Sequence, residues 1–418
     1  MSRDRGPSAR RTGAAPIYLL LEGSLGFYFA LAYTINLVYQ YTVVGLNPLQ
    51  LVLVGTVLEA TAFFCEIPTG LVADTYSRRL SIVTGCVLLG LSLVLQGAIP
   101  TFAAILLSQV VSGLGYTFLS GATEAWLADE VGEEAAAPLY LRGSQTGQAA
   151  GFVGTFASVG LASITLALPI VASGVGILLL ALALALLMPE RGFAPLPQAE
   201  RNSFGKLAGT FTEGVATVRA SPILLTIVAI ILFRGASSEA FDRLWQAHFV
   251  ANFTFPTLGT LEPIVWFGII AALGRLVSLG STELVRRRVD TTTQAGAAGA
   301  LFVVNVVLIA AILALALAGN FGLALGAYLV AAACRTTSNP IYTAWINRQV
   351  SSRVRATVIS FTAQADALGQ IAGGPAIGWV GTAFSLRAAL VVGALVLAPI
   401  VPLLGRSSRQ SAVGSRQG

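Results

Sequence analysis

The chain has 418 residues, of which 55% are hydrophobic and only 11% are charged, against about 25% charged residues in an average soluble domain. The mean hydropathy is +0.79, and a soluble core of this size cannot hide so much apolar surface. The composition therefore excludes a cytosolic enzyme, a secreted disulfide scaffold, a disordered chain and a nucleic-acid-binding protein. The net charge of +6 is explained by cationic loops beside a membrane. We expect an integral membrane protein in a lipid bilayer.

The residue types that bind metals and nucleotides are scarce. The three cysteines, Cys65, Cys86 and Cys334, lie in apolar runs without a CxxC pair, and His248 is the only histidine. We expect His248 at the membrane interface, and no metal site built on cysteine and histidine. The only Gly-Lys pair, at 205–206, is followed by leucine, so the phosphate-binding loop of an ATP-driven pump is missing. No cofactor is predicted.

Twelve stretches are long and apolar enough to cross a bilayer as helices, which takes about 20 residues each. In the first half they lie near residues 16–40, 49–72, 80–99, 101–128, 141–165 and 167–188. In the second half they lie near residues 222–248, 262–284, 292–318, 320–345, 355–380 and 383–404. The pattern predicts an all-α membrane protein with twelve transmembrane helices in two pseudo-symmetric six-helix bundles.

The two bundles are expected at residues 1–188 and 221–418, joined by a polar cytoplasmic linker at 189–220. Within the linker, apolar residues at helical spacing predict a short interfacial helix. These residues are Phe204, Leu207, Phe211 and Val215.

Arginine marks one side of the membrane. Most of the 25 basic residues lie in the terminal tails, in the central linker and in the loops after even-numbered spans. The positive-inside rule then predicts that both termini are cytoplasmic. We expect a multi-pass protein of the cell inner (cytoplasmic) membrane.

Short segments of the first half recur in the second. Residues 125–127 (AWL) recur as residues 344–346 (AWI), and residues 147–151 (GQAAG) recur as residues 369–373 (GQIAG). The order and spacing are the same in both halves, which indicates duplication. The small residues of the second pair predict close helix packing. Duplicated halves favour a transport site between two bundles over a fixed channel.

Residues 70–79 (GLVADTYSRR) join the second and third spans. This segment resembles the glycine–aspartate–arginine signature of the major facilitator superfamily, and a weaker echo follows the eighth span at residues 280–288. The resemblance covers the whole transmembrane region and implies transport by alternating access. It implies a gating role for five residues, in which glycine permits close helix approach and the arginines hold the cytoplasmic turn. They are Gly70, Asp74, Arg78, Arg79 and Asp129.

Residues 66–70 (EIPTG) resemble the drug–proton antiporter branch of that superfamily, particularly the tetracycline and macrolide exporters. The resemblance implies export of an amphiphilic compound in exchange for protons. Gln109 stands where the branch often has an arginine, four residues before a Gly-x-Gly. The glycine–proline signature that the branch carries in the fifth span is also missing there, while residues 373–375 (GGP) lie in the eleventh span.

Ionisable side chains inside the membrane are costly and usually line a cavity or pair with each other. Carboxyl groups in the spans are predicted to carry protons, and we expect Asp366 to pair with Arg335. Glu22, Tyr33, Asn36 and Gln40 are spaced to form one helical stripe. The predicted proton-coupling residues are Glu22, Glu59, Glu66 and Asp366. The predicted substrate-cavity residues are Asn36, Gln40, Gln109, Tyr116, Glu124, Arg234, Arg275, Arg335, Asn339 and Tyr342.

Structural roles compete with each of these assignments. Glu22 has the alternative of a hydrogen bond to a neighbouring helix, Glu66 that of supporting the signature loop, and Arg275 that of pairing with a carboxylate. The tyrosines have the alternatives of packing or of an interfacial belt. The acidic run at residues 129–134 is read as a solvated loop.

The principal hypothesis is a secondary-active exporter of amphiphilic drugs, driven by protons and acting as a monomer. Uptake or export of a metabolite, nutrient or siderophore is the alternative within transport. A membrane enzyme or an ATP-driven pump is a further alternative, which the missing phosphate-binding loop and the missing catalytic constellation disfavour.

Overall fold

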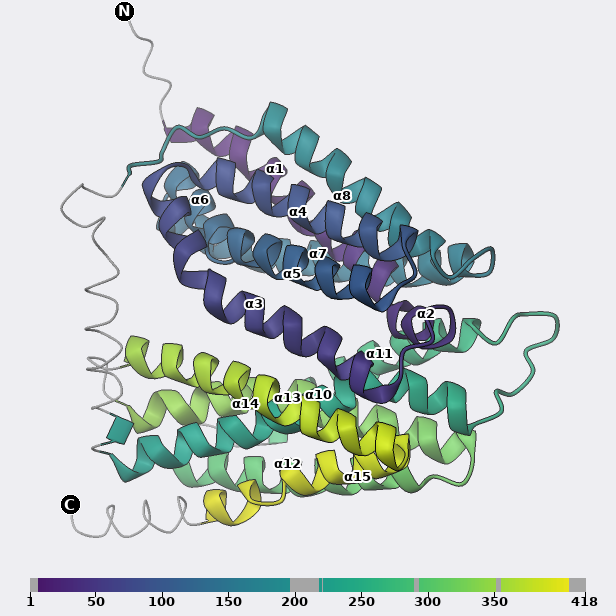
Figure 1. Ribbon diagram of the computed structural model, residues 1–418. Helices are drawn as coiled ribbons and strands as arrows, with labels where there is room; N and C mark the ends of the chain where they lie inside the picture. Colours follow the sequence, from purple (N-terminus) through teal and green to yellow (C-terminus); the bar gives the residue numbers. More distant parts are fainter. Residues whose placement is uncertain (1–6, 196–217, 220, 289–292, 351–354, 406–418) are drawn as a thin grey trace, which may run out of the picture. The chain divides into compact units, whose positions relative to one another are not determined.

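A computed structural model describes residues 7–195, 218–219, 221–288, 293–350 and 355–405 (Figure 1). The predicted interfacial helix of the linker lies outside these residues. The first half contains helices α1 (Pro7–Tyr33), α2 (Asn36–Thr42), α3 (Pro48–Thr75), α4 (Arg78–Ala98), α5 (Phe102–Leu119), α6 (Ala122–Val131), α7 (Glu133–Ala162) and α8 (Leu168–Leu187). The second half contains α10 (Pro222–Asn252), α11 (Val265–Arg288), α12 (Gln294–Leu317), α13 (Phe321–Gln349), α14 (Arg355–Ala383) and α15 (Leu386–Val396).

Two of the predicted spans are broken helices. The first divides into α1 and α2 at Thr34 and Ile35, where the Thr34 hydroxyl donates to the Ala30 carbonyl at 2.6 Å. Such a bond competes with the helix ladder and bends it. The fourth span divides into α5 and α6 at Gly121, whose φ of 71° favours glycine. The residues from Glu22 to Gln40 therefore do not lie on one continuous helix, as the predicted stripe requires, because α1 ends at Tyr33 and α2 begins at Asn36.

Short polar residues start many of the helices. Their side-chain oxygens accept hydrogen bonds from backbone N–H groups of the first turn, which have no partner within the helix. In this way Thr101 begins α5 and Asn320 begins α13, the corresponding helix of the second half. The other caps of this kind are Ser77, Ser221, Thr293 and Ser385.

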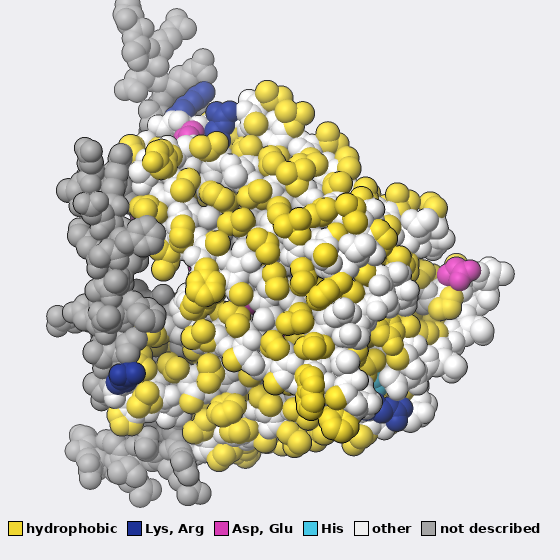
Figure 2. All heavy atoms as spheres, viewed as in Figure 1, with side chains coloured by type: hydrophobic (Ala, Val, Ile, Leu, Met, Phe, Trp, Pro, Cys, Tyr) yellow, Lys and Arg dark blue, Asp and Glu magenta, His cyan; other side chains and the backbone are white. Residues whose placement is uncertain are grey.

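Length and hydropathy match a membrane protein. Among the described residues, nine helical segments are long and apolar enough to cross a bilayer, with α1–α2 and α5–α6 each counting as one segment. Helices α7, α13 and α14 have 30, 29 and 29 residues and are more polar. Together these make twelve segments. On the face drawn in Figure 2, hydrophobic side chains cover much of the surface and charged ones lie mostly near its margins.

The chain divides into two compact units. Unit 1 comprises the described residues of Met1–Gly45 and Val57–Ser203, and unit 2 comprises Leu46–Thr56 and the described residues of Phe204–Gly418. The first turns of α3 thus belong to unit 2, which the predicted division at the central linker did not include. In unit 1, α1 packs on α7 and α8, and α4 packs on α5 and α8. In unit 2, α10 packs on α14 and α15, and α12 packs on α13 and α15, which repeats the same arrangement.

The repeated glycines lie at equivalent helix contacts. A Cβ atom at Gly26 of α1 would overlap the backbone of Gly147 in α7. In unit 2, a Cβ atom at Gly369 of α14 would overlap the Leu232 carbonyl of α10, and one at Gly235 would overlap the Asp366 carbonyl. The prediction of close helix packing at these glycines is confirmed. Because α10 and α14 nearly touch, side chains on their flanks meet in one pocket.

Candidate functional site

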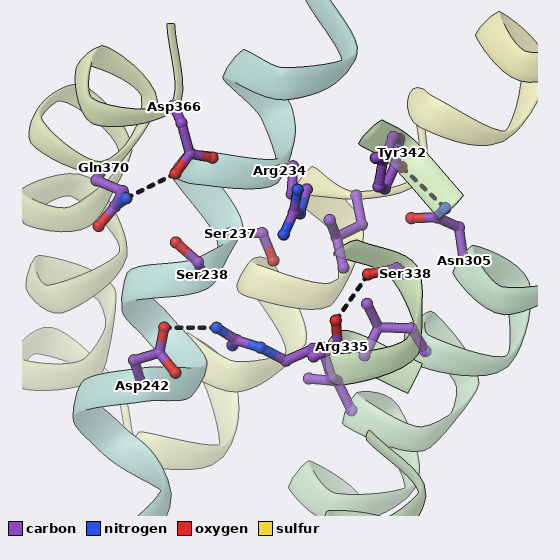
Figure 3. A pocket seen from close by; sticks show the side chains of 13 residues that line it. Arg234, Ser237, Ser238, Asp242, Asn305, Arg335, Ser338, Tyr342, Asp366 and Gln370 are labelled. Carbon is purple, nitrogen blue, oxygen red and sulfur yellow. Dashed lines mark hydrogen bonds and ion pairs between the residues drawn. The ribbon is translucent and has the colours of Figure 1, made fainter. Parts of the chain in front are cut away.

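Unit 2 encloses a cavity of about 150 Å³ between α10, α12, α13, α14 and the end of α15. Its lining is mostly polar, and Figure 3 shows the side chains that converge on it. Four predicted site residues, from three different helices, line it: Arg234, Arg335, Tyr342 and Asp366. The sequence therefore identified side chains that the fold brings together from distant parts of the chain.

The cation Arg335 is paired. Its guanidinium donates to a carboxylate oxygen of Asp242 at 2.5 Å and lies over the Phe241 ring, 4.8 Å from the centroid. The predicted pairing of Arg335 with Asp366 is therefore wrong. Asp242 lies on α10 one turn from Ser238 and was not among the predicted site residues.

The second cation, Arg234, contacts neutral groups. Its guanidinium donates to the Asn339 side-chain oxygen and lies 5.0 Å from the centroid of the Tyr342 ring. The Tyr342 hydroxyl accepts a hydrogen bond of 3.0 Å from Asn305 on α12, which holds the ring in place. The ion pairs between described residues include none that involves Arg234. Arg234 thus brings a positive charge to the cavity wall.

The carboxylate of Asp366 faces the same cavity from α14. One of its oxygens accepts a hydrogen bond of 3.0 Å from Gln370, one turn further along the helix. Among the charged neighbours of Asp366, Arg234 has the largest electrostatic effect and Arg335 a smaller one. Gln370, Asn305 and the cavity serines were not predicted, since uncharged polar residues in an apolar helix carry a weaker signal.

The predicted carboxylates of the first half lie in unit 1, on several helices. Glu22 is on α1, Glu59 and Glu66 are on α3, and Glu124 is on α6. Glu22 is half-buried and lies within electrostatic range of Glu124. The Tyr116 side chain is 58% exposed and lies within electrostatic range of Glu59, Glu66 and Glu124. We call these five residues the acidic face. The proton-coupling role of Glu22, Glu59 and Glu66 and the substrate-cavity role of Glu124 and Tyr116 remain predictions.

The signature loop is held by ion pairs and backbone contacts within unit 1. Arg78 lies 2.6 Å from Asp129 on α6 and 3.7 Å from Asp74. Arg79 donates to the Ala185 carbonyl of α8. Among the described residues, nothing lies within 4 Å of a Cβ atom built at Gly70, so the expected close helix approach is not seen within this part of the chain. The arginines and aspartates meet as the resemblance implies, whereas no packing role of the glycine is seen among the residues described.

Hydrogen bonds also connect the start of the predicted linker to the signature loop and to α6. Glu130 accepts backbone N–H groups of Arg191 and Gly192. Glu190 accepts the Ser77 hydroxyl at 2.6 Å and the Arg79 backbone N–H at 2.9 Å. Glu130 is only 6% exposed, so reading it as part of a solvated loop is wrong. The sequence does not distinguish Glu130 from the other acidic residues at 129–134, so this role could not be predicted.

Three other predicted cavity residues are buried in unit 1, and two of them, Asn36 and Gln109, belong to a hydrogen-bonded network. Gln96 of α4 donates to the Asn36 side-chain oxygen and accepts from Gln109 at 3.0 Å. Gln40 is fully buried, and its two side-chain polar atoms have no partner among the described residues. These amides belong to unit 1, and contact with substrate remains a prediction for them.

Two residues of unit 2 lie away from the cavity of that unit. Arg275 is half-buried on α11 and does not line it. His248 is fully buried, with Nε2 3.1 Å from the Leu315 carbonyl and both residues near the ends of their helices; its position at the membrane interface remains a prediction. The echo of the signature is a local cluster at the end of α11, where Glu283 pairs with Arg286 at 2.7 Å and Arg287 at 2.5 Å.

Across its described residues, the structure has twelve helical segments in two similar units, with a charged signature loop in unit 1 and a charged cavity in unit 2. A comparison of the sequence with known families adds a second line of evidence. Residues 23–374 match the Major Facilitator Superfamily. The chain belongs to this superfamily. It is therefore a membrane transporter with the major facilitator fold, and not an enzyme.

Relatives of this facilitator agree with that assignment. YxaM of Bacillus subtilis (strain 168), an uncharacterized MFS-type transporter, is 24% identical over 362 residues, covering 85% of this chain and 86% of YxaM. A crystal structure of the nucleoside transporter NupG has a TM-score of 0.72 and 13% identity, covering 94% of this chain and 98% of its own. A bacterial homolog of the human lysosomal transporter Spinster has a TM-score of 0.71 and 16% identity, covering 96% and 97%. At these identities the solved structures show the fold alone.

Proposed function

We propose that this facilitator exports amphiphilic compounds, such as tetracycline-type antibiotics, in exchange for protons and by alternating access. The observation that carries the proposal is the acidic face of unit 1. Carboxyl groups in membrane-spanning helices are costly unless they face water, take up a proton or bind a cation. The ion pairs between described residues include none for Glu22, Glu66 or Glu124. These groups are suited to exchanging a proton for a cationic substrate.

The aromatic ring of Tyr116 adds an apolar contact to this acidic face. Aromatic faces attract cations and stack on planar molecules, so carboxylates around an exposed tyrosine suit a substrate with a positive charge and an apolar body. A proton that crosses a potential of 100 mV releases about 2.3 kcal/mol. In exchange for an uncharged or zwitterionic molecule, this energy supports a concentration ratio of about 50-fold per proton. One-for-one exchange for a monovalent cation moves no net charge and is driven by the pH gradient alone. We further propose that the protein acts as a monomer in the inner membrane with cytoplasmic termini.

Proton-driven transport in proteoliposomes tests this function. The full chain is reconstituted, pH and voltage are imposed independently, and movement of tetracycline and of ethidium is followed. We expect export that is driven by an inward proton gradient and abolished by a protonophore. Glu22→Gln is expected to slow proton-driven transport at least about tenfold, while Glu133→Gln, at an exposed position at the start of α7, leaves it unchanged. Transport that ignores both gradients would refute the proposal.

The unit 2 cavity favours a second candidate, transport of a small charged metabolite. Two arginines and two aspartates line a cavity of about 150 Å³, which suits a compact polar molecule better than an extended apolar one. Growth of a producing strain on single nutrients, compared with a strain lacking the protein, separates the two candidates. Growth that depends on the protein would support uptake. Drug resistance in the producing strain, with no such growth advantage, would support export.

A further inference from the structure

We propose that the unit 2 cavity binds a zwitterionic group of the substrate, with its carboxylate on Arg234 and its ammonium on Asp366. The inference rests on the proposed transport of a small molecule and specifies the charge of that molecule. It follows from which charges in the cavity are already paired and which are not.

The charges of the Arg335–Asp242 pair already balance each other. The carboxylate lies 2.5 Å from the guanidinium, and the Phe241 ring covers the cation from another side. That ring stacks on Tyr328, with 5.6 Å between centroids and 5° between planes. An ion pair fixed in this way has little to gain from a further charged group, because each charge already has its partner.

Arg234 and Asp366 have unused hydrogen-bonding capacity. A guanidinium has five N–H donors, and the hydrogen bond described for Arg234 is to a neutral amide oxygen. Asp366 accepts from Gln370 through one oxygen. Figure 3 shows Arg234 between Tyr342 on one side and Asp366 on the other. Both side chains line the same cavity.

Charge balance selects the ligand. The two arginines and two aspartates of the lining sum to zero when all are ionised, so an anion alone would be repelled by Asp366 and a cation alone by Arg234. A ligand that carries both charges satisfies both residues. Arginine binds carboxylates with two parallel N–H···O bonds, and a carboxylate accepts several bonds from an ammonium group.

Cavity size limits the distance between the two charges. The volume of about 150 Å³ far exceeds the roughly 10–15 Å³ that one water needs, so several heavy atoms fit. A space of this size suits a compact charged group better than an extended apolar molecule. The two charges must therefore be only a few bonds apart, as in an α-amino acid, and any large apolar body must lie outside.

Binding of three matched compounds tests the assignment. L-Phenylalanine carries both charges, L-phenylalaninamide only the cation and N-acetyl-L-phenylalanine only the anion. Binding to the full chain in lipid nanodiscs at pH 7, without any gradient, is measured by calorimetry. We expect L-phenylalanine to bind at least about tenfold more tightly than either analogue, since each lost partner removes a charge-assisted hydrogen bond.

Variants assign each charge to its residue. Arg234→Gln is expected to remove the advantage of L-phenylalanine over the amide, and Asp366→Asn its advantage over the N-acetyl compound. Arg286→Gln, a control at an exposed arginine of the same unit, is expected to keep the wild-type order. Arg234→Lys and Asp366→Glu keep the charge and are expected to restore part of the preference where the neutral variants fold poorly.

Equal binding of the three compounds to the wild-type protein would overturn the inference. So would a preference that survives both neutral substitutions. If Arg234→Gln and Asp366→Asn lowered the melting temperature but left the order of the three compounds unchanged, both residues would have a purely structural role, which would also overturn the inference. Because no gradient is present, failure here leaves proton-driven export standing, and failure of export leaves the binding result standing.

Discussion

Arg335 on α13 and Asp242 on α10 form an ion pair of 2.5 Å that ties two helices of unit 2 together. Their positions are 93 residues apart in the chain. The pair holds one cation of the cavity in a fixed state and leaves Arg234 as the cation that contacts only neutral groups among the described contacts.

Removing one partner of this pair is expected to destabilise the protein. Asp242→Asn leaves the Arg335 charge without its carboxylate, and we expect a loss of about 1–2 kcal/mol, since both side chains are partly accessible. The measurement is thermal unfolding in detergent, with the charge-exchanged double variant Asp242→Arg/Arg335→Asp as the comparison. Recovery of stability in the double variant is expected; equal loss in both would show that packing rather than charge holds the helices.

The signature arginine is expected to depend more on Asp129 than on Asp74. The Arg78–Asp129 distance is 2.6 Å and the Arg78–Asp74 distance is 3.7 Å, and a charge-assisted hydrogen bond needs the shorter one. A double-mutant cycle of Arg78→Ala with Asp129→Ala should give a coupling energy of about 1–2 kcal/mol. The same cycle with Asp74→Ala should give less than half of that. A larger coupling with Asp74 would contradict the geometry.

Glu130 is expected to anchor the residues that follow α8. Its carboxylate accepts two backbone N–H groups, from Arg191 and Gly192, and Glu130→Ala leaves both donors without that acceptor. Limited proteolysis of the purified protein should therefore cut near residues 189–195 several times faster in this variant. Glu134→Ala, at an exposed position of α7, serves as the control. Identical cleavage of the two variants would show that Glu130 is not the anchor.

Two buried glutamines of unit 1, Gln96 in the hydrogen-bonded network and Gln40 outside it, are expected to respond differently to the same substitution. Gln96→Leu breaks hydrogen bonds with Asn36 and Gln109 and should cost about 1–3 kcal/mol. Gln40→Leu removes two buried polar atoms that have no described partner, so stability should stay equal or rise. Thermal unfolding measures both. A large loss for Gln40→Leu would reveal a bound water or other partner at that side chain.

Hydropathy predicted the helices better than it predicted their neighbours. The twelve stretches were visible because each must bury about 20 apolar residues in lipid, and the repeated glycines at 147 and 369 were visible because close packing excludes larger residues. The breaks at Thr34 and Gly121 depend on local backbone bonds and one positive φ. A run of apolar residues does not encode such breaks.

The sequence alone determined that the chain spans a membrane as two similar sets of six helices, because composition and the period of apolar residues follow from the solvent that surrounds each helix. It also placed charged residues at membrane depth. Only the tertiary structure decided which charges meet. Arg335 binds Asp242 and not Asp366, and Glu130 accepts backbone N–H groups of the residues that follow α8. Among the described residues, nothing lies within 4 Å of a Cβ atom built at Gly70. The reason is that pairing depends on the rotation and crossing of packed helices, which many distant side chains set together.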